Sequence, residues 1–233
     1  MVVTVFGNTA LAASPLPSDA VANLTPAPID PADFSATVDN PWFPLVPGTT
    51  FTYKGSSDGG PSKDVFEVTH ETAVIDGVPV TVVHDTVYEG GRKVEETTDW
   101  YTQDRDGNVW YFGEDTRTFD EQGNVESTEG TWQAGVDGAQ PGIFMPAAPA
   151  IGQSFQQESS PGHAEDWFVT ILTGQRARVP YGSYPDAMVT LEWTPLEPDV
   201  LSEKVYAMGV GLISESDVKG GKDRFELVSI ATE

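Results

Sequence analysis

Apolar and polar residues alternate with a period of two from Thr49 to the end of the chain, which is the spacing of half-buried β-strands. Short turn sequences, many of them pairing Gly with Asp or Asn, separate the alternating runs. This pattern of apolar and polar residues predicts no helix longer than two turns, so the chain is expected to form an antiparallel meander. The pattern predicts strands at residues 49–54, 62–75, 78–89, 92–103, 116–120, 125–133, 154–158, 163–174, 187–194, 201–208, 211–216 and 224–230.

The central hairpin is expected at residues 97–112, which read TTDWYTQDRDGNVWYF. Aromatic runs lie on both sides of Asp106-Gly107, and this arrangement is a strong short-range hairpin signal. The related sequences DRDGNV at 104–109 and DEQGNV at 120–125 indicate a shared turn chemistry, in which Asp hydrogen-bonds its own turn. The first of them superficially resembles a calcium loop, but the residue spacing of an EF-hand is missing, so turn chemistry is the better explanation.

Three segments depart from the strand pattern. Residues 1–13 are apolar and then small, and Ala10-Leu11-Ala12 fits the A-x-A cleavage pattern, so we interpret them as a signal-peptide remnant without its positive n-region. Residues 14–39 are rich in Pro and Ala and predict an extended N-terminal segment, with a short helical turn capped by Asp30. Residues 134–152 combine several Gly and Pro residues with apolar side chains and predict a long irregular loop.

The fold class predicted from these features is all-β. One β domain is expected over residues 40–233, formed as a single antiparallel β-barrel or a strongly curved meander sheet. The cluster of Trp42, Phe43 and Leu45 lies among prolines, and we expect it to plug the apolar end of the barrel. A chain of 233 residues buries a core large enough to need no disulfides.

Composition narrows the classes of function. Asp and Glu outnumber Lys and Arg by 36 to 12, a net charge of −24, which argues against binding to nucleic acid or to anionic membrane surfaces. The chain has no Cys, so thiolate metal sites and cysteine nucleophiles are excluded. No apolar run is long enough to span a membrane, and with the signal-like start this predicts a secreted, periplasmic or cell-surface protein.

Two short motifs resemble those of secreted bacterial all-β proteins that are themselves uncharacterised. The opening motif is Phe43-Pro44-Leu45-Val46-Pro47-Gly48-Thr49-Thr50 with Tyr53, and the closing motif is Val179-Pro180-Tyr181-Gly182-Ser183 with Gly209-Val210-Gly211-Leu212. Such proteins resemble lipoprotein-carrier-like curved sheets. The resemblance implies export and a β architecture over roughly residues 40–230, and it transfers no catalytic residue.

The sharpest catalytic hypothesis follows from strand pairing. If Gly90-Gly91 is a two-residue turn, His84 lies opposite Thr97, with Asp99 as a diagonal neighbour. If the loop of the central hairpin has an even number of residues, Asp99, Tyr101, Trp110, Phe112 and Glu114 share that face, whereas an odd loop moves Glu114 away. A histidine between two carboxylates suits general acid–base catalysis, so His84, Asp99 and Glu114 are the predicted catalytic residues of a hydrolase or lyase.

Ligand and metal sites are predicted from the same patterns. Aromatic and apolar side chains suited to stacking a sugar ring are Tyr101, Trp110, Phe112, Phe144 and Met145. A polar group at the start of a strand, His163 with Glu165, could complete a metal site with Asp137 of the irregular loop. No cofactor is predicted; the acidic balance favours cationic partners such as Ca²⁺, so a divalent cation is kept as an alternative.

Three functions are compatible with the sequence. The first is an exported acidic protein that binds a small or carbohydrate-like ligand in an aromatic-lined concavity. The second is a hydrolase or lyase that uses His84 with Asp99 or Glu114, and the third is an interaction module without a small-molecule site. If His84 lies away from both acids or faces solvent, the enzyme hypothesis loses its basis.

Overall fold

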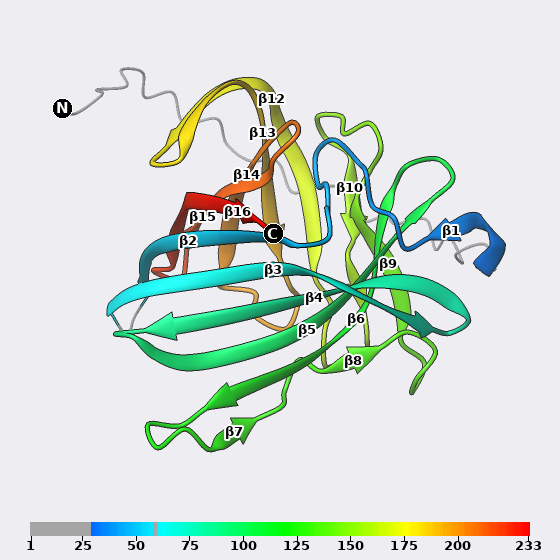
Figure 1. The fold of residues 1–233 in the computed structure, drawn as a ribbon, viewed down its shortest axis with the longest axis horizontal. Coiled ribbons are helices and arrows are strands. Elements are labelled where there is room, and N and C mark those ends of the chain that lie inside the picture. The colour runs from blue at the N-terminus through cyan, green and yellow to red at the C-terminus, as the bar shows by residue number, and fades with distance from the viewer. Residues whose placement is uncertain (1–28, 58–59) are drawn as a thin grey trace.

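The computed structural model describes residues 29–57 and 60–233, which fold into one curved antiparallel sheet in the shape of a barrel (Figure 1). Two meanders build it. The first contains β2 (Thr49–Ser57), β3 (Gly60–Ile75), β4 (Val78–Glu89), β5 (Arg92–Asp104), β6 (Val109–Phe119) and β9 (Gln140–Met145). The second contains β12 (Trp167–Val179), β13 (Gly182–Trp193), β14 (Leu201–Ala207), β15 (Gly211–Lys219) and β16 (Arg224–Thr232). The predicted all-β fold is confirmed.

The two meanders are joined along both of their edges. On one side β16 pairs with β2, so the last strand lies beside the first long one. On the other side a single stretch of chain bridges the gap. Its first half, β10 (Ser154–Gln156), pairs with β12, and its second half, β11 (Glu158–Ser159), pairs with β9. Gln157 lies between the two halves and is buried, so this stretch brings the sheet close to full closure.

Part of the predicted loop at 134–152 is regular structure. Residues 140–145 form β9, which pairs with β6 and β11, so the expectation that Gly and Pro exclude a strand there is wrong. The reason is the closeness of the chains at the barrel seam. A Cβ atom on Gly142 would lie 2.3 Å from the carbonyl oxygen of Gln156, so glycine here permits the approach rather than breaking the strand.

Substitution of Gly142 is therefore expected to open the seam. We expect Gly142→Ala to destabilise the protein by about 2 kcal/mol or more, because backbone atoms must move apart. Gly182→Ala is the matched control, since its nearest neighbour is the mobile end of the Tyr184 side chain at 3.3 Å. Urea unfolding of both variants measures the difference. Equal stability losses would show that the seam is not tightly packed.

The N-terminal part of the described chain closes one end of the barrel. Asp30 caps the short 3₁₀ helix η1 (Pro31–Asp33), as the sequence predicts, and β1 (Phe34–Ser35) pairs with β5. The segment that follows buries Trp42, Phe43 and Leu45, and the Phe43 ring contacts Phe66, Tyr101 and Phe144. The predicted apolar plug is confirmed, while the signal-like residues 1–13 and most of 14–39 lie outside the described residues.

Three short strands lie outside this barrel path, β1 and two strands that pair with β6. β7 (Val125–Ser127) and β8 (Trp132–Gln133) both pair with β6. Within residues 29–57 and 60–233, no helix has the length and apolar character needed to cross a membrane.

Candidate ligand-binding site

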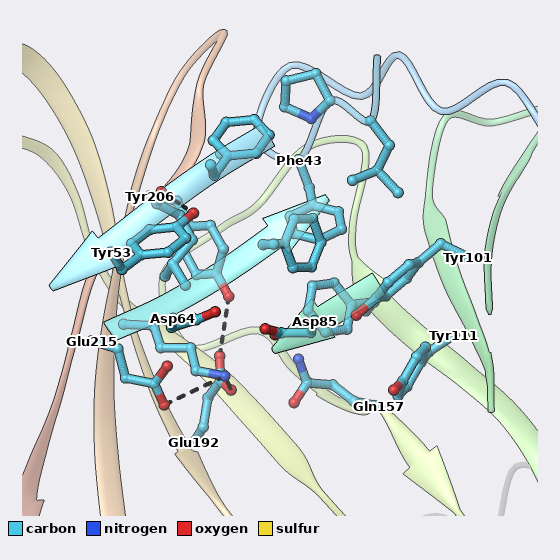
Figure 2. Close-up of a pocket in the computed structure, with 18 of the residues that line it drawn as sticks. Phe43, Tyr53, Asp64, Asp85, Tyr101, Tyr111, Gln157, Glu192, Tyr206 and Glu215 are labelled. Carbon is cyan, nitrogen blue, oxygen red and sulfur yellow. Dashed lines mark hydrogen bonds and ion pairs between the residues drawn. The ribbon is translucent and has the colours of Figure 1, made fainter. Parts of the chain in front are cut away.

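A cavity of about 220 Å³ lies inside the barrel, below the plug. Inward-facing residues of both meanders and of the seam line it, so it is a product of the closed sheet rather than of one loop. Its walls combine aromatic rings with carboxyl groups (Figure 2). The aromatic lining residues are Phe43, Phe51, Tyr53, Phe66, Tyr101, Tyr111, Phe144 and Tyr206, and the acidic ones are Asp64, Asp85, Glu158, Asp166, Glu192 and Glu215.

Two of these carboxyls, Asp64 and Asp85, point toward each other in the cavity (Figure 2). Strand register places them there: Asp64 lies opposite Tyr53 on β2, and Asp85 lies opposite Phe66 on β3. The Oδ1 atom of each is buried and accepts no hydrogen bond from a described residue outside the pair. Burial raises the pKa of Asp64 to about 6, although its hydrogen bond to Asp85 acts in the opposite direction. Burial and the charge of Asp64 raise the pKa of Asp85 well above its usual range.

Lys204 is the one basic residue that lines the cavity, and it is already paired. Its Nζ atom lies 2.8 Å from Oε2 of Glu192 and 3.7 Å from Oε1 of Glu215. Burial alone would lower the pKa of Lys204, but the two carboxylates hold it well above the ordinary value. The hydroxyl group of Tyr206 donates to Glu192 at 3.4 Å. Lys204 thus supplies a positive charge to one wall of the cavity, while the Asp64–Asp85 wall has none.

A second set of buried acids lies beneath the cavity, around Asp99. Asp99 accepts a short hydrogen bond from the hydroxyl group of Tyr111, whose ring lines the cavity. Burial, with a contribution from the charge of Asp85, raises the pKa of Asp99 to about 8. Burial and the charge of Glu158 raise the pKa of Glu114, the strand partner of Asp99, to about 10. The interior therefore holds several carboxyl groups that are protonated at neutral pH.

The structure does not bring His84 to these acids. Glu89 pairs with Arg92 as expected, but a β-bulge leaves Val94 without a partner and shifts the register by one residue. His84 therefore lies opposite Thr98 rather than Thr97, and its exposed side chain is on the outer face. The predicted pairing is wrong, and the same shift turns Asp85 inward.

Asp99 and Glu114 do come together, by a different route from the one expected. The hairpin loop has an odd number of residues, since Gln103 pairs with Val109, and this turns Tyr111 inward. A second bulge follows at Gly113, where φ is +131°, and it restores Glu114 to the face of Asp99. Both acids thus share an interior face.

The predicted ligand-binding residues divide between the two faces of the sheet. Tyr101 and Phe144 line the cavity. Trp110 and Phe112 lie on the outer face, where both rings pack edge-on against Phe34, so their expected place beside Asp99 is wrong. Met145 is buried in the core and does not line the cavity.

The predicted metal ligands do not form a cluster. His163 and Asp137 are both exposed, and Glu165 accepts a hydrogen bond from the backbone of Gly162. Across the ranges that the structure describes, no three His, Asp or Glu side chains are placed to hold a metal ion. At the calcium-like turn, the Asp104 carboxylate accepts from the Asn108 backbone, the Asn108 side chain and the Trp110 indole, which confirms the predicted turn chemistry.

Several lining residues are missing from the prediction, above all Asp64, Asp85, Lys204 and Tyr206. The alternation of inward and outward positions along each strand does indicate some of these residues. Asp64 has the same parity as Phe66, and Lys204 has the same parity as Tyr206, so each charged residue shares a face with a large aromatic residue. A charged position in phase with core positions indicates a polar interior.

Comparisons with known proteins give a fold resemblance. No protein-family model and no curated protein sequence matches the chain. A crystal structure from Bacteroides fragilis NCTC 9343, of a protein assigned as exported and with a YmcC-like fold, is 15% identical with a TM-score of 0.46, covering 82% of this chain and 99% of its own. A second, from Parabacteroides distasonis ATCC 8503 and assigned as a lipoprotein, is 11% identical with a TM-score of 0.43, covering 82% and 98%. These values mark a general likeness, and the barrel is established by its strand pairing.

Proposed function

We propose that this chain is an exported binding protein that holds one small polar ligand inside its barrel. The observation that carries the proposal is the cavity itself, with aromatic walls and two buried carboxyl oxygens that accept no hydrogen bond from a described residue outside the Asp64–Asp85 pair. Buried acceptors without partners are costly, so a ligand that donates hydrogen bonds to them gains affinity. Export remains part of the proposal because of the signal-like sequence at 1–13.

The size of the cavity limits the ligand. Sites for drug-sized molecules measure about 300–1,000 Å³, and this cavity is about 220 Å³. A ligand no larger than a monosaccharide is therefore expected, with its apolar faces against the rings and its polar atoms toward the carboxyls. The carbohydrate-like ligand considered from the sequence is one such molecule.

The hydrolase or lyase alternative has lost the histidine on which it was based. His84 is exposed on the outer face, and it lies in a separate surface hollow with His70, Glu67 and Glu71. A group that acts as general base must reach the substrate directly or through one water molecule. Binding in the interior cavity is therefore independent of His84.

A cavity-blocking variant tests the proposal. Leu212 lines the cavity, so Leu212→Trp is expected to fill it and to abolish the rise in Tm that small ligands produce in the wild-type protein. Leu196→Trp is the matched control, because Leu196 is exposed in the turn between β13 and β14. His84→Ala serves as a second control. The measurement is a thermal-shift series with neutral monosaccharides, small alcohols, small amines and small carboxylates.

The expected pattern has ligand-induced shifts in the wild-type, Leu196→Trp and His84→Ala proteins, and none in Leu212→Trp. A panel in which no compound shifts the wild-type Tm would overturn the proposal. So would a compound whose effect is the same in Leu212→Trp.

A further inference from the structure

Acidic and basic residues are strongly unbalanced in the cavity lining. Six acidic residues face one basic residue, and that residue, Lys204, is already paired with Glu192 and Glu215. None of the ion pairs given above includes Asp64 or Asp85, and the charges with the largest effects on the pKa values of these two residues are all acidic. The acidic wall therefore has no positive partner from the part of the chain that the structure shows.

The same wall is short of hydrogen-bond donors. Apart from the hydrogen bond between the two carboxyls, the buried Oδ1 atoms of Asp64 and Asp85 accept none from the described residues, and a carboxylate can only accept. A hydroxyl group of a ligand would supply a donor but no charge. An ammonium group supplies up to three donors and a positive charge, so it satisfies both deficits at once.

Aromatic rings lie next to these two carboxyls. Tyr53 lies directly across the strand pair from Asp64, and Phe66 lies directly across from Asp85. Phe43 and Tyr206 complete the upper part of the same lining (Figure 2). Aromatic ring faces attract cations, most strongly where water is excluded. The apolar part of an amine can pack on the same rings.

We propose that the cavity binds a small organic cation whose ammonium group lies between the carboxyls of Asp64 and Asp85, with its carbon skeleton against the surrounding aromatic rings. This inference rests on the proposed function and narrows the ligand from any small polar molecule to an amine. It does not extend to metal ions, because the described carboxyls are not arranged in a metal-binding group.

Binding of an amine is expected to release a proton. The neighbouring carboxyls of Asp64 and Asp85 share one proton in the empty site, and the ammonium group replaces that proton when the amine binds. The ionisable groups that act on the pair are Glu215 on β15 and Glu95 and Asp99 on β5. All of them are acidic, so each one that is ionised opposes ionisation of the empty site. Affinity for the amine should therefore fall as the pH is lowered from about 7 to about 5.

The test is a calorimetric titration of the wild-type protein with four probes. Butylammonium is expected to bind at least about tenfold more tightly than 1-butanol, its neutral counterpart of similar size, because the lost contacts are charge-assisted hydrogen bonds. Butyrate is expected not to bind, and glucose to bind more weakly than butylammonium. Titration in two buffers of different ionisation enthalpy at about pH 7 measures the released proton.

Two substitutions locate the ammonium group. Asp64→Asn and Asp85→Asn are each expected to weaken butylammonium binding at least about tenfold while changing 1-butanol binding little. Glu67→Gln removes the same charge from the exposed face of the same strand as Asp64 and should bind as the wild type does. Circular dichroism checks that each variant is folded, and the wild-type proton release tests the inference if either variant fails to fold.

The possible outcomes separate the two levels of the proposal. If glucose or 1-butanol binds as tightly as butylammonium and Leu212→Trp blocks that binding, the amine inference fails and the proposed function stands. If butylammonium binds without proton release and equally well to both Asn variants, the amine inference also fails. If none of the four probes nor any compound of the thermal-shift panel binds, both fail together.

Discussion

The ligand-free protein is expected to be markedly more stable near pH 5 than near pH 8. Burial raises the pKa of Asp99 to about 8 and of Glu114 to about 10, and it also raises the pKa of Asp85 and Glu158. In the unfolded chain these carboxyls titrate near their ordinary values of about 4. Between about pH 4 and about pH 8 the folded state therefore binds more protons than the unfolded state, so the free energy of unfolding falls as the pH rises.

The size of this effect is large because several groups contribute. Each unit of pKa difference corresponds to about 1.4 kcal/mol, so Asp99 alone is expected to change the free energy of unfolding by several kcal/mol across its window. Glu96 and Asp120, whose pKa values are lowered by hydrogen bonds, act in the opposite direction, but both are at the surface and contribute little. Urea unfolding at a series of pH values measures the slope.

Asp99→Asn identifies the source of the pH dependence. An Asn side chain still accepts the hydrogen bond from Tyr111 and cannot ionise, so the variant should lose less stability than the wild type on going from about pH 5 to about pH 8. Asp115→Asn makes the same chemical change at a half-exposed position of β6 and should leave the slope unchanged. A wild-type stability that is constant or rises over this range would contradict the assignment of the buried acids.

Many of the strands could be predicted from the sequence because alternation, turn residues and strand length agree there. The predicted strand at 125–133 is wrong, since it is divided into β7 and β8, and β13 begins at Gly182 rather than at residue 187. β4 begins and ends where the pattern places it, and the all-β class, the capped turn at Asp30 and the Trp42–Leu45 plug follow from local chemistry. The strand at Gly142 could not be predicted, because the role of this glycine depends on residues distant in the sequence. It allows a distant part of the chain to approach, and no short-range pattern carries that information.

The residues of the site could be predicted only where the pairing register of neighbouring strands could be predicted. Two bulges, at Val94 and at Gly113, each shift one strand by one residue, and a shift of one residue exchanges the two faces. The bulge at Val94 places Asp85, rather than His84, on the interior face with Asp99. The odd hairpin loop sends Trp110 outward, and the second bulge returns Glu114 inward. A bulge adds one residue to a strand and hardly changes the pattern of apolar and polar residues in the sequence. The sequence therefore predicts that an acidic and aromatic face exists, but not which residues belong to it.

Removal of the Lys204 ammonium group is expected to be among the most damaging single changes in the barrel. Lys204→Met should destabilise the protein by about 3–5 kcal/mol near pH 8, because Glu192 and Glu215 remain buried without their positive partner. Lys219→Met is the matched control. Lys219 makes an exposed ion pair with Asp199 at 3.5 Å, and such pairs contribute about 1 kcal/mol or less.

The damage should depend on pH in a way that a packing defect would not. Burial raises the pKa of Glu215, so this carboxyl takes up a proton as the pH falls and the uncompensated charge disappears. The stability deficit of Lys204→Met relative to the wild type is therefore expected to shrink between about pH 8 and about pH 5. A second substitution, Glu192→Gln, should recover part of the loss in the Lys204→Met background. If Lys204→Met costs no more than Lys219→Met, or if its deficit is the same at every pH, Lys204 is not the charge that balances this wall of the cavity.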